Sequence, residues 1–492
     1  MENVGIINKT CDMAGIPRLT PDNMDFDDEE VWKSIREDTV GVFQWESNSS
    51  TQYLKKLFSD ETIRKIRKVN PNFSYLNLLS VGNGAIRPAG ESYRDRLAVG
   101  EFNDNGHPAL NELLKNTNGF LVYQEQIIAF LHQFCGYSMG QADIVRRHFS
   151  KKTGTEEDIP KIKEGFIKTM GEKCGVSKEE AEQIVEKFLR VIEDASDYLF
   201  SENHALPYSM IGYACAWLRY HYPLEFCTAY MNTYFDDEEK LNKIIAYMEK
   251  HGIKLEPPKF RHSIENYICS KENNTIYKGL KSIKFISVDC AKQLYDIRMM
   301  DFPTFTDLLV YISENTTINI RQVRVLTTIN FFSEFGKNKK LLSVLELFGN
   351  RYSKQHTDKT KVKRVAEIKK FEADAEDVAL PLNEQIELEQ EYVGYITVRI
   401  EDIPKRYVYV KDIDTKYTPR VTLYCLNTGK TLEMKVDKKA FAKNKIKKGD
   451  VIYCKKFIKR ENWSKTDDGF VRNGTFSDCL TDWKNVNGIF GE

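Results

Sequence analysis

The sequence predicts a multidomain protein that is mainly α-helical and ends in an all-β domain. Three observations support this fold class. Apolar residues recur at helical spacing through the N-terminal part of the chain. From Glu391 onward, alternating and β-branched residues separated by turn signals are typical of short strands. The length of 492 residues allows two to four domains and more than one sizeable core.

The composition argues against several classes of protein. Lysine plus arginine and aspartate plus glutamate both number 72, so affinity for nucleic acid must come from local basic patches. The ten cysteines include no CxxC pair and no Cys/His cluster at metal-ligand spacing, which argues against a zinc site or a disulfide framework. The sequence has no apolar run long enough to span a bilayer and no N-terminal secretion signal. We therefore expect a cytoplasmic protein with reduced thiols and no membrane partner.

Residues 2–14 are predicted to form the first helix, which ends at Gly15. A dense acidic run follows, and paired carboxylates can hold the metal ions of a two-metal site. We favour a structural interpretation, in which Asp27 caps a helix that begins at DEEVWKSI and acidic residues fill its first turn. The run consists of Asp22, Asp25, Asp27, Asp28, Glu29 and Glu30.

The stretch from Gly119 to Lys152 predicts two helices that carry the main functional candidates. Gly136 ends the first helix, and Ser138 with Gln141 forms a capping box for the second. The cations form either a solvated basic face or a phosphate clamp, for which bidentate guanidinium groups are well suited. The cations on the second helix are Arg146, Arg147 and Lys151.

Two other segments of the helical region indicate a packed core and a candidate binding loop. Residues 155–199 show an amphipathic pattern that indicates core packing. Arg87 and Pro88 lie in a glycine-bearing loop, where the backbone can approach a phosphate or a base closely. The alternative for Arg87 is a salt bridge that pins the loop.

The C-terminal part begins with residues 351–375, which are polar and rich in lysine and which we interpret as a basic linker. Five short strands then suit an OB-fold barrel. Such barrels bind single strands through aromatic rings and cations, although a barrel that is only a spacer would show the same strands. The predicted strands are YVGYITVRI, RYVYVKDI, RVTLYCL, TLEMKVD and DVIYCKKFIKR. The aromatic and basic candidates are Tyr407, Tyr409, Tyr424, Lys455, Lys456, Lys459 and Arg460.

The order of motifs in the chain resembles that of a known family. YQEQ, GYSMGQAD, RR and KK, in the stretch 119–152, resemble the fingers domain of the alpha subunit of bacterial DNA polymerase III, the C-family replicative polymerases. EDTVGVFQWESNSSTQYLKKL resembles the start of those fingers. FSENHALPYSMIGYACAWLRYHYPLEF resembles the family's FNKSH loop and the helix that ends at its HYP motif. The resemblance covers nearly all 492 residues and corresponds to about the C-terminal half of the polymerase.

This resemblance implies a nucleotide-binding site. Arg87 is in register with the family's RPG segment and His204 with the histidine of FNKSH, so each is expected to contact nucleotide or DNA. The alternative for His204 is a capping or core histidine. Residues 201–203 replace the family's asparagine, lysine and serine, so that an anion stands where a cation is expected. By the same resemblance, the groups that face the triphosphate of the incoming nucleotide are Arg146, Arg147 and Lys151.

A later region resembles the linker and the tandem helix-hairpin-helix module that follow the fingers in this family. The matching segments are HGIKLEPPKF, YKGLKSIKFISVDCAKQLYDIR and INFFSEFGKNKKLLSVLELF. Such hairpins hold the DNA backbone through main-chain amides at a glycine-bearing turn. Gly279 is in place, whereas Phe285 and Ser287 stand where the family has glycines. Lys339 lies in a matching position at the end of the module and is expected to bind DNA.

The resemblance also sets the expected domains and function. We expect fingers at 1–235, a linker with tandem hairpins at 236–350, a basic linker at 351–386 and an OB-fold domain at 387–492. The family's three metal-binding aspartates lie in its palm, and none of them is in this sequence. We therefore expect part of a split DNA-directed DNA polymerase, a nucleotidyltransferase of DNA replication that is inactive without its palm. The alternative is a non-catalytic DNA-binding remnant or a DNA-holding factor.

The expected ligands and partners follow from this function. The chain alone is expected to bind no cofactor, and Mg²⁺ is expected on the missing palm. The expected partners are a palm-containing polymerase chain, primer-template DNA and deoxynucleoside triphosphates. A sliding clamp has no clear motif here, because the best segment, Gln385–Leu388, lacks an aromatic residue. The residues expected to bind DNA are Lys455, Lys456, Lys459, Arg460, Tyr424 and Lys339.

Overall fold

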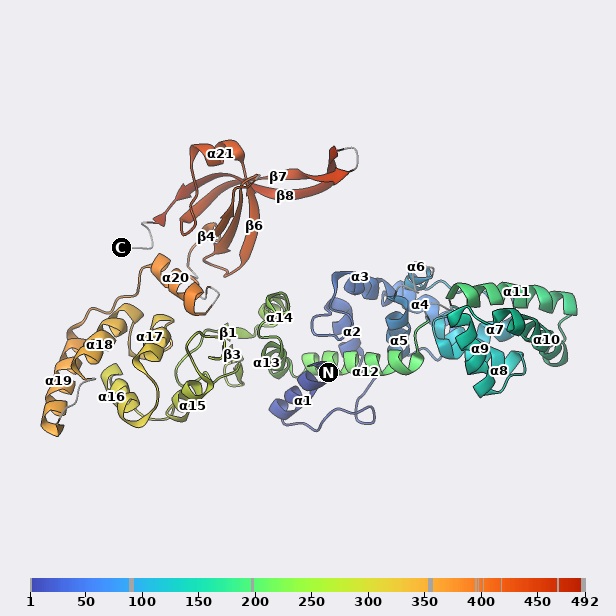
Figure 1. Cartoon of the computed structure of the whole chain (residues 1–492), viewed down its shortest axis with the longest axis horizontal. Coiled ribbons are helices and arrows are strands. Elements are labelled where there is room, and N and C mark those ends of the chain that lie inside the picture. Colours follow the sequence, from blue (N-terminus) through green and yellow to red (C-terminus); the bar gives the residue numbers. More distant parts are fainter. Residues whose placement is uncertain are drawn as a thin grey trace. The chain divides into compact units, whose positions relative to one another are not determined.

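The computed structural model (Figure 1) describes residues 2–87, 93–195, 199–352, 357–393, 396, 398–400, 402–416, 418–466 and 469–487. The chain divides into two compact units, Met1–Lys254 and Leu255–Glu492. Most elements are helices and the last strands close a barrel, which confirms the predicted fold class. The expected domain boundary after residue 235 stays a prediction. Within the described residues, no helix is both long enough and apolar enough to cross a membrane.

The first unit is built of helices, most of which contribute to one of two apolar clusters of described residues. In chain order they are α1 (Glu2–Ala14), α2 (Glu29–Glu37), α3 (Asn48–Leu57), α4 (Asp60–Val69), α5 (Tyr75–Ala85), α6 (Arg94–Ala98), α7 (Pro108–Leu113), the 3-10 helix η2 (Lys115–Thr117), α8 (Gln124–Phe134), α9 (Met139–Lys151), α10 (Thr155–Cys174), α11 (Lys178–Ala195), α12 (Glu202–His221), α13 (Pro223–Thr233) and α14 (Glu238–Lys250). One core joins α2–α6 and α12 around the fully buried Trp32 and Trp45. The other joins α7–α11, where the ring of Phe130 lies 5.7 Å from that of Phe166 and 4.6 Å from that of Phe188.

The acidic run begins a helix, as predicted, but Asp28 rather than Asp27 is the cap. The Asp28 carboxylate accepts the N–H groups of Glu30 and Val31 at 3.1 and 3.2 Å. Asp27 lies one residue earlier and donates its own N–H to Asp25 at 2.9 Å. The prediction was early by one residue because both aspartates precede the same acidic turn. Over the residues that the structure describes, no group of three His, Cys, Asp or Glu side chains could hold a metal ion.

Helix α12 is central to the first unit and packs against α1, α2, α5 and α13 (Figure 1). Tyr213 is fully buried in it. Arg219, near its C-terminal end, is 1% exposed. Its guanidinium donates to the carbonyl oxygens of Val40, Asp38 and Ser34 at 2.5, 2.7 and 3.2 Å. These bonds satisfy carbonyls at the end of α2 and fix the following loop against α12.

The second unit contains a small sheet, a helical region and a barrel. Its elements are β1 (Lys254–Glu256), β2 (Ile268–Ser270), β3 (Thr275–Tyr277), α15 (Val288–Asp296), α16 (Phe305–Asn315), α17 (Ile320–Thr328), the 3-10 helix η3 (Ser333–Phe335), α18 (Asn338–Arg351), α19 (Asp358–Asp374), α20 (Leu382–Tyr392), β4 (Tyr407–Asp414), β5 (Arg420–Cys425), β6 (Thr431–Val436), α21 (Lys438–Lys443), β7 (Val451–Thr466) and β8 (Gly469–Asn485). The small sheet has the strand order β1-β3-β2. Helices α15–α19 enclose a core that contains Phe305, Leu326 and Val344.

The barrel closes in the order β4-β5-β6-β8-β7, which is consistent with an OB-fold. Strands β6 and β8 run parallel, with Val436 opposite Leu480, whereas β4–β5, β4–β7, β5–β6 and β7–β8 are antiparallel. The strand predicted at 392–400 is not found at residues 392–393, 396 and 398–400, and the rest of that segment lies outside the described residues. The missing strand is β8, whose many polar residues hide the alternation that would reveal it.

The interpretation of residues 351–375 as a linker was also wrong. Residues 353–356 lie outside the described residues, but α19 is a regular helix of 17 residues. Ile368 of α19 is fully buried in the core of the helical region. Glu372 is 7% exposed, and its carboxylate accepts the N–H groups of Phe305 and Thr306 at 2.8 and 2.9 Å. The helix was missed because it docks through one narrow stripe and one buried carboxylate rather than through a broad apolar face.

Replacing Glu372 tests whether α19 is part of the fold. Glu372→Ala leaves two buried N–H donors of α16 without a partner, so we expect a loss of about 1–3 kcal/mol in the free energy of unfolding. The measurement is chemical denaturation of the full chain. Glu367→Ala is the matched control, since Glu367 is an exposed glutamate of the same helix, and it should change stability by less than about 0.5 kcal/mol. Equal effects of the two variants would contradict the capping role.

Candidate functional site

The predicted arginine pair lies on α9, and one carboxylate holds both arginines. The helix starts as predicted, because the side chains of Ser138 and Gln141 each accept the other residue's N–H. Arg146 donates to Asp143 Oδ1 through Nε at 3.1 Å and Nη2 at 2.8 Å. Arg147 donates to Asp143 Oδ2 at 2.6 Å. Asp143 therefore fixes the orientation of both guanidinium groups.

The two arginines differ in their access to a ligand. The side chain of Arg146 is 14% exposed, whereas that of Arg147 is 62% exposed. Ile144, Arg147 and Lys151 follow one another at helical spacing and are all exposed, so they share one face of α9. The structure therefore brings Arg147 and Lys151 together on the surface and turns Arg146 away from them.

The charge of this group is partly compensated. Hydrogen bonds from Arg146 keep the pKa of Asp143 below its ordinary value of 3.8; partial burial opposes this effect, and the bond from Arg147 adds to it. At neutral pH the carboxylate therefore cancels one of the two guanidinium charges. Lys151, which has no ion pair with any described residue, adds a further positive charge one turn away.

A second cluster forms at the amino end of α12, where three motifs from distant parts of the sequence meet. The guanidinium of Arg87 lies 5.1 Å from the ring centroid of Phe200 and donates to Gln44 Oε1 at 3.4 Å. The ring of His204 lies 6.4 Å from that of Phe200 and 6.3 Å from that of Tyr208. We call Gln44, Arg87, Phe200, His204 and Tyr208 the α12 cluster.

The contacts of the α12 cluster bear on the alternatives left open for two residues, whose roles in binding stay predictions. Arg87 is half-buried against a ring and an amide, its Nε has no hydrogen-bond partner in the described structure, and it forms no ion pair with a described residue. His204 is exposed and caps no helix, so it is neither a core nor a capping histidine. Pro88 and the rest of that loop to residue 92 lie outside the described residues.

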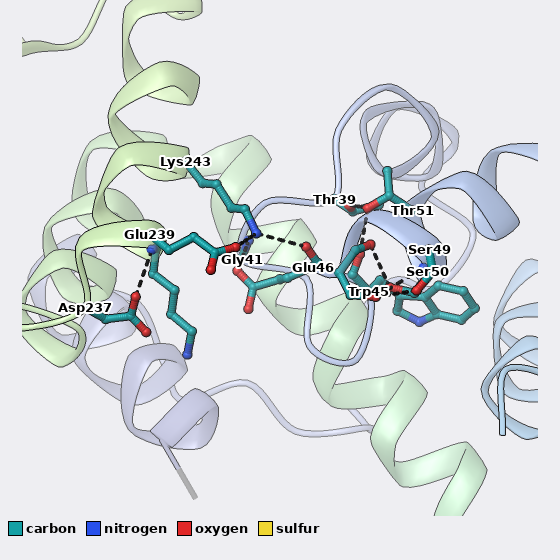
Figure 2. Close-up of polar contacts among 12 residues, drawn as sticks. Thr39, Gly41, Trp45, Glu46, Ser49, Ser50, Thr51, Asp237, Glu239 and Lys243 are labelled. Carbon is teal, nitrogen blue, oxygen red and sulfur yellow. Dashed lines mark hydrogen bonds and ion pairs between the residues drawn. The ribbon is translucent and has the colours of Figure 1, made fainter. Parts of the chain in front are cut away.

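The loop that carries Gln44 is held by a polar network that sequence reasoning missed. Figure 2 shows Glu46 beside Gly41 and Lys243. Glu46 Oε1 accepts the N–H of Gly41 at 2.9 Å and the hydroxyl of Tyr230 at 2.5 Å. Lys243 donates to the carbonyl oxygen of Glu46 at 3.5 Å. These bonds hold a loop in which Gln44 has a φ of 73°, a conformation that only glycine adopts without strain.

Glu125, from the YQEQ motif, is a further residue that sequence reasoning missed. Its Oε1 accepts the hydroxyl of Ser201 at 2.7 Å and the side-chain amide of Asn203 at 3.4 Å, and its Oε2 accepts the N–H of Glu202 at 2.9 Å. Partial burial raises the pKa of Glu202, and the charge of Glu125 adds to this rise. The amino end of α12, a position that favours anions, is thus filled by the protein's own carboxylate.

The two clusters share α8 as a common neighbour. Glu125 lies in its first turn and holds α12, and the N–H of Gln124 donates to the carbonyl oxygen of Phe200 at 3.1 Å. The other end of α8 leads through Gly136 into α9. Among the described residues no hydrogen bond or ion pair joins Arg146 or Arg147 to the α12 cluster. The connection between the clusters is therefore made by the helices themselves.

The predicted DNA-binding residues of the second unit fall into two groups. Lys456, Lys459 and Lys339 are exposed. Lys455 lies 3.9 Å from Asp482, and Arg460 donates to Asp437 at 2.6 Å. These five cations are at the surface, and their role in DNA binding stays a prediction.

The aromatic candidates of the barrel require a correction. Tyr424 is 4% exposed, and its hydroxyl donates to the carbonyl oxygen of Val398 at 2.9 Å. Burial raises the pKa of Tyr424 to about 12. Tyr409 is 1% exposed. Neither ring has a free face on which a base could stack, because both lie on the side of the strands opposite the barrel core of Val408 and Leu423 and pack with Ile386 of α20 in a second apolar cluster.

Comparison with known proteins identifies the two parts of the chain that carry these features. Residues 89–174, which include α8 and α9, match the bacterial DNA polymerase III alpha subunit finger domain, and residues 252–342 match a helix-hairpin-helix motif. The DNA polymerase III subunit alpha of Halalkalibacterium halodurans is 29% identical over 314 residues, 63% of this chain and 26% of the relative. That of Staphylococcus aureus is 29% identical over 320 residues, 64% of this chain and 28% of the relative. That of Thermus aquaticus is 28% identical over 334 residues, 67% of this chain and 26% of the relative. The chain thus spans about a quarter of the length of the curated relatives it matches.

The charge state of Asp143 can be tested through the pH dependence of stability. A carboxyl with a lowered pKa in the folded state stabilises the protein fully above its ordinary pKa of 3.8, and this contribution is lost as the pH falls through the lowered value. Asp143→Asn removes the contribution, so the difference in unfolding free energy between about pH 7 and about pH 3 should shrink, by at most about 1 kcal/mol because the pair is near solvent. Asp194→Asn, at an exposed aspartate of α11, is the control. If the difference in unfolding free energy between the two pH values stayed the same in Asp143→Asn, the ion pairs of Asp143 with Arg146 and Arg147 would be contradicted.

A second test concerns the carboxylate that holds α12. Glu125→Ala leaves an N–H at the start of α12 and a serine hydroxyl without their acceptor, so we expect a loss of about 0.5–2 kcal/mol in the free energy of unfolding. Thermal or chemical denaturation measures the loss. Glu172→Ala, at an exposed glutamate of α10, should have no measurable effect. A Glu125→Ala protein as stable as the wild type would show that α12 does not depend on this cap.

Proposed function

We propose that this chain, which is similar to the bacterial DNA polymerase III alpha subunit, supplies nucleotide and DNA binding to a cytoplasmic DNA-directed DNA polymerase. The observation that carries the proposal is the exposed face of α9. Within the matched finger region this face presents Arg147 and Lys151 one helical turn apart. Two accessible cations on a capped helix suit the triphosphate of an incoming nucleotide.

Asp143 organises this binding surface. It holds Arg147 through one bond of 2.6 Å and leaves 62% of the side chain exposed, so other N–H donors of the guanidinium remain for phosphate oxygens. Arg146 is bound twice by the same carboxylate and is largely buried. We therefore assign Arg146 to positioning Asp143 and Arg147, and the direct phosphate contacts to Arg147 and Lys151.

The α12 cluster is proposed to bind the nucleotide or the primer-template. His204 is exposed between the rings of Phe200 and Tyr208, and a base can stack against such a row of rings. Arg87 lies against Phe200 and retains donors for a phosphate. The acidic Glu202 next to this surface is tied to Glu125 through its backbone.

We place the metal-binding aspartates on a separate palm-containing chain. The matched part is about a quarter of the relatives' length, so most of a polymerase lies outside these 492 residues. Magnesium ions on that palm would align the attacking and leaving oxygens. In this arrangement the present chain binds and orients the triphosphate, and the helix-hairpin-helix region and the exposed lysines of β7 hold DNA.

A DNA-holding factor without a polymerase role is the second candidate. The match to a helix-hairpin-helix motif and the compensation of the arginine charges by Asp143 favour it. It predicts DNA affinity that falls steeply with salt and no binding of nucleotide to α9. Nucleotide binding therefore separates the two functions.

Primer extension by the reconstituted enzyme tests the proposal. The folded chain is mixed with a palm-containing chain of a related polymerase, Mg²⁺, primer-template and deoxynucleotides. We expect extension only when both chains are present. Two folded chains that bind each other but extend no primer would overturn the polymerase role and leave the DNA-holding factor.

In the reconstituted enzyme, Arg147→Ala should raise the KM for deoxynucleotide about tenfold or more, because a charged hydrogen bond to phosphate is lost. The affinity for primer-template should stay unchanged, as measured by fluorescence anisotropy. Arg190→Ala, an exposed arginine of α11, is the matched control and should leave KM unchanged. An equal loss of DNA affinity and nucleotide affinity in Arg147→Ala would assign α9 to DNA instead.

A further inference from the structure

The turn before α15 is where a helix-hairpin-helix motif grips a phosphate, and in this chain its composition and contacts are unusual. It runs from Ile283 to Ser287, within the matched region 252–342. We propose that this turn binds single-stranded nucleic acid by base stacking on Phe285 and Arg321, in place of a main-chain grip on phosphate. The inference extends the proposed function by naming the ligand of this turn, but it stands on contacts that are independent of α9 and α12.

Two main-chain donors of the turn are already engaged by the protein. The N–H of Lys284 donates to the carbonyl oxygen of Tyr392 at 2.8 Å, and that of Ile286 donates to Ile283 at 3.2 Å. Ser287 caps α15, because its hydroxyl oxygen accepts the N–H of Cys290 at 3.1 Å. Amides used in this way are not free to hold a phosphate oxygen.

Packing does not explain why residue 285 is a phenylalanine. Its backbone has a φ of 69°, in the left-handed region that favours glycine. A residue with a side chain is strained in this backbone conformation. The ring nevertheless remains 46% exposed. A strained backbone that presents a large apolar ring to solvent is a combination expected at a binding site.

The surroundings of the ring supply the chemistry for nucleic acid. The guanidinium carbon of Arg321 lies 3.6 Å from the ring centroid of Phe285, and Arg321 is itself exposed. The outer face of the guanidinium is therefore a second planar surface, and bases stack on such guanidinium planes as they do on aromatic rings. The exposed Lys284 is next in sequence to the ring, and neither Lys284 nor Arg321 has an ion pair with a described residue.

The position of the ring is held from several sides. Tyr392 lies edge-on to it, with ring centroids 6.4 Å apart, and Gln322 donates to the carbonyl oxygen of Phe285 at 3.2 Å. Asp289, a carboxylate close in sequence, is engaged by Gln293 at 2.5 Å and Thr317 at 3.2 Å. Asp289 forms no ion pair with either of the two cations beside the ring among the described residues. An aromatic ring with uncompensated cations suits unpaired bases on a charged backbone better than an uncharged protein surface.

Binding of labelled oligothymidylate to the full chain, followed by fluorescence anisotropy, tests the proposal. Phe285→Leu keeps an apolar side chain and the strained backbone but removes the ring, and Phe285→Gly removes the ring and the strain. Both variants should weaken binding of the single strand about fivefold or more. Both should bind a duplex of equal length as the wild type does. Met299→Ala, at a residue of the same unit that is 84% exposed, is the control and should bind both ligands normally.

Photocrosslinking separates this turn from the barrel, which also offers exposed cations. An oligonucleotide that carries 5-iodouracil should crosslink to the peptide containing Phe285. Crosslinks confined to the barrel, or a Phe285→Leu protein with wild-type affinity for the single strand, would overturn the proposal. An equal loss of duplex binding would likewise overturn it, because it would assign the turn to the DNA backbone. These assays need no partner chain or nucleotide, so their failure is distinct from a failure of primer extension.

Discussion

The carboxylate of Glu125 ties the amino end of α12 to the first turn of α8, and the arrangement of both candidate clusters depends on it. It accepts bonds from Ser201 and Glu202 on one side, while α8 continues through Gly136 into α9 on the other. The helix that carries His204 is therefore held at the start of α8, and the helix that carries the arginine pair follows the end of α8. The bonds of one carboxylate thus fix the amino end of α12, next to His204, relative to α8.

Internal acceptors occupy the positions where this protein would otherwise attract anions most strongly. Glu125 fills the amino end of α12, Asp143 holds both arginines of α9, and the carbonyl oxygen of Tyr392 accepts a turn amide before α15. Each acceptor orients donors before a ligand arrives, which lowers the ordering cost of binding. Each also lowers the positive potential that a ligand meets, in keeping with a chain whose acidic and basic residues are equal in number.

The elements that local signals specify could be predicted from the sequence, whereas those that depend on a distant partner could not. The capping box of Ser138 and Gln141 lies within four residues and can be recognised from the local sequence alone, so the start of α9 was predicted correctly. The role of Glu372 depends on amides 66 and 67 residues away, and nothing in its own neighbourhood marks it as buried. Tyr424 was misjudged for a related reason, since its ring is covered by α20, a helix more than 30 residues earlier in the chain. Glu125 belonged to a quoted motif, but only the fold shows what it binds.

Because internal acceptors already bind some of the backbone N–H groups, side chains rather than the main chain are expected to recognise a ligand. Where amides at a helix start or a hairpin turn are already bonded, a ligand can be held only by groups that still project from the surface. In the described residues the projecting groups are Arg147 with its cationic neighbour on α9, His204 with its flanking rings on α12, and Phe285 with Arg321 at the turn before α15. Side chains of this kind bind through charge and planar stacking, and both interactions tolerate any base. A surface built in this way suits a ligand whose sequence varies at every step, such as a template strand and its incoming nucleotides.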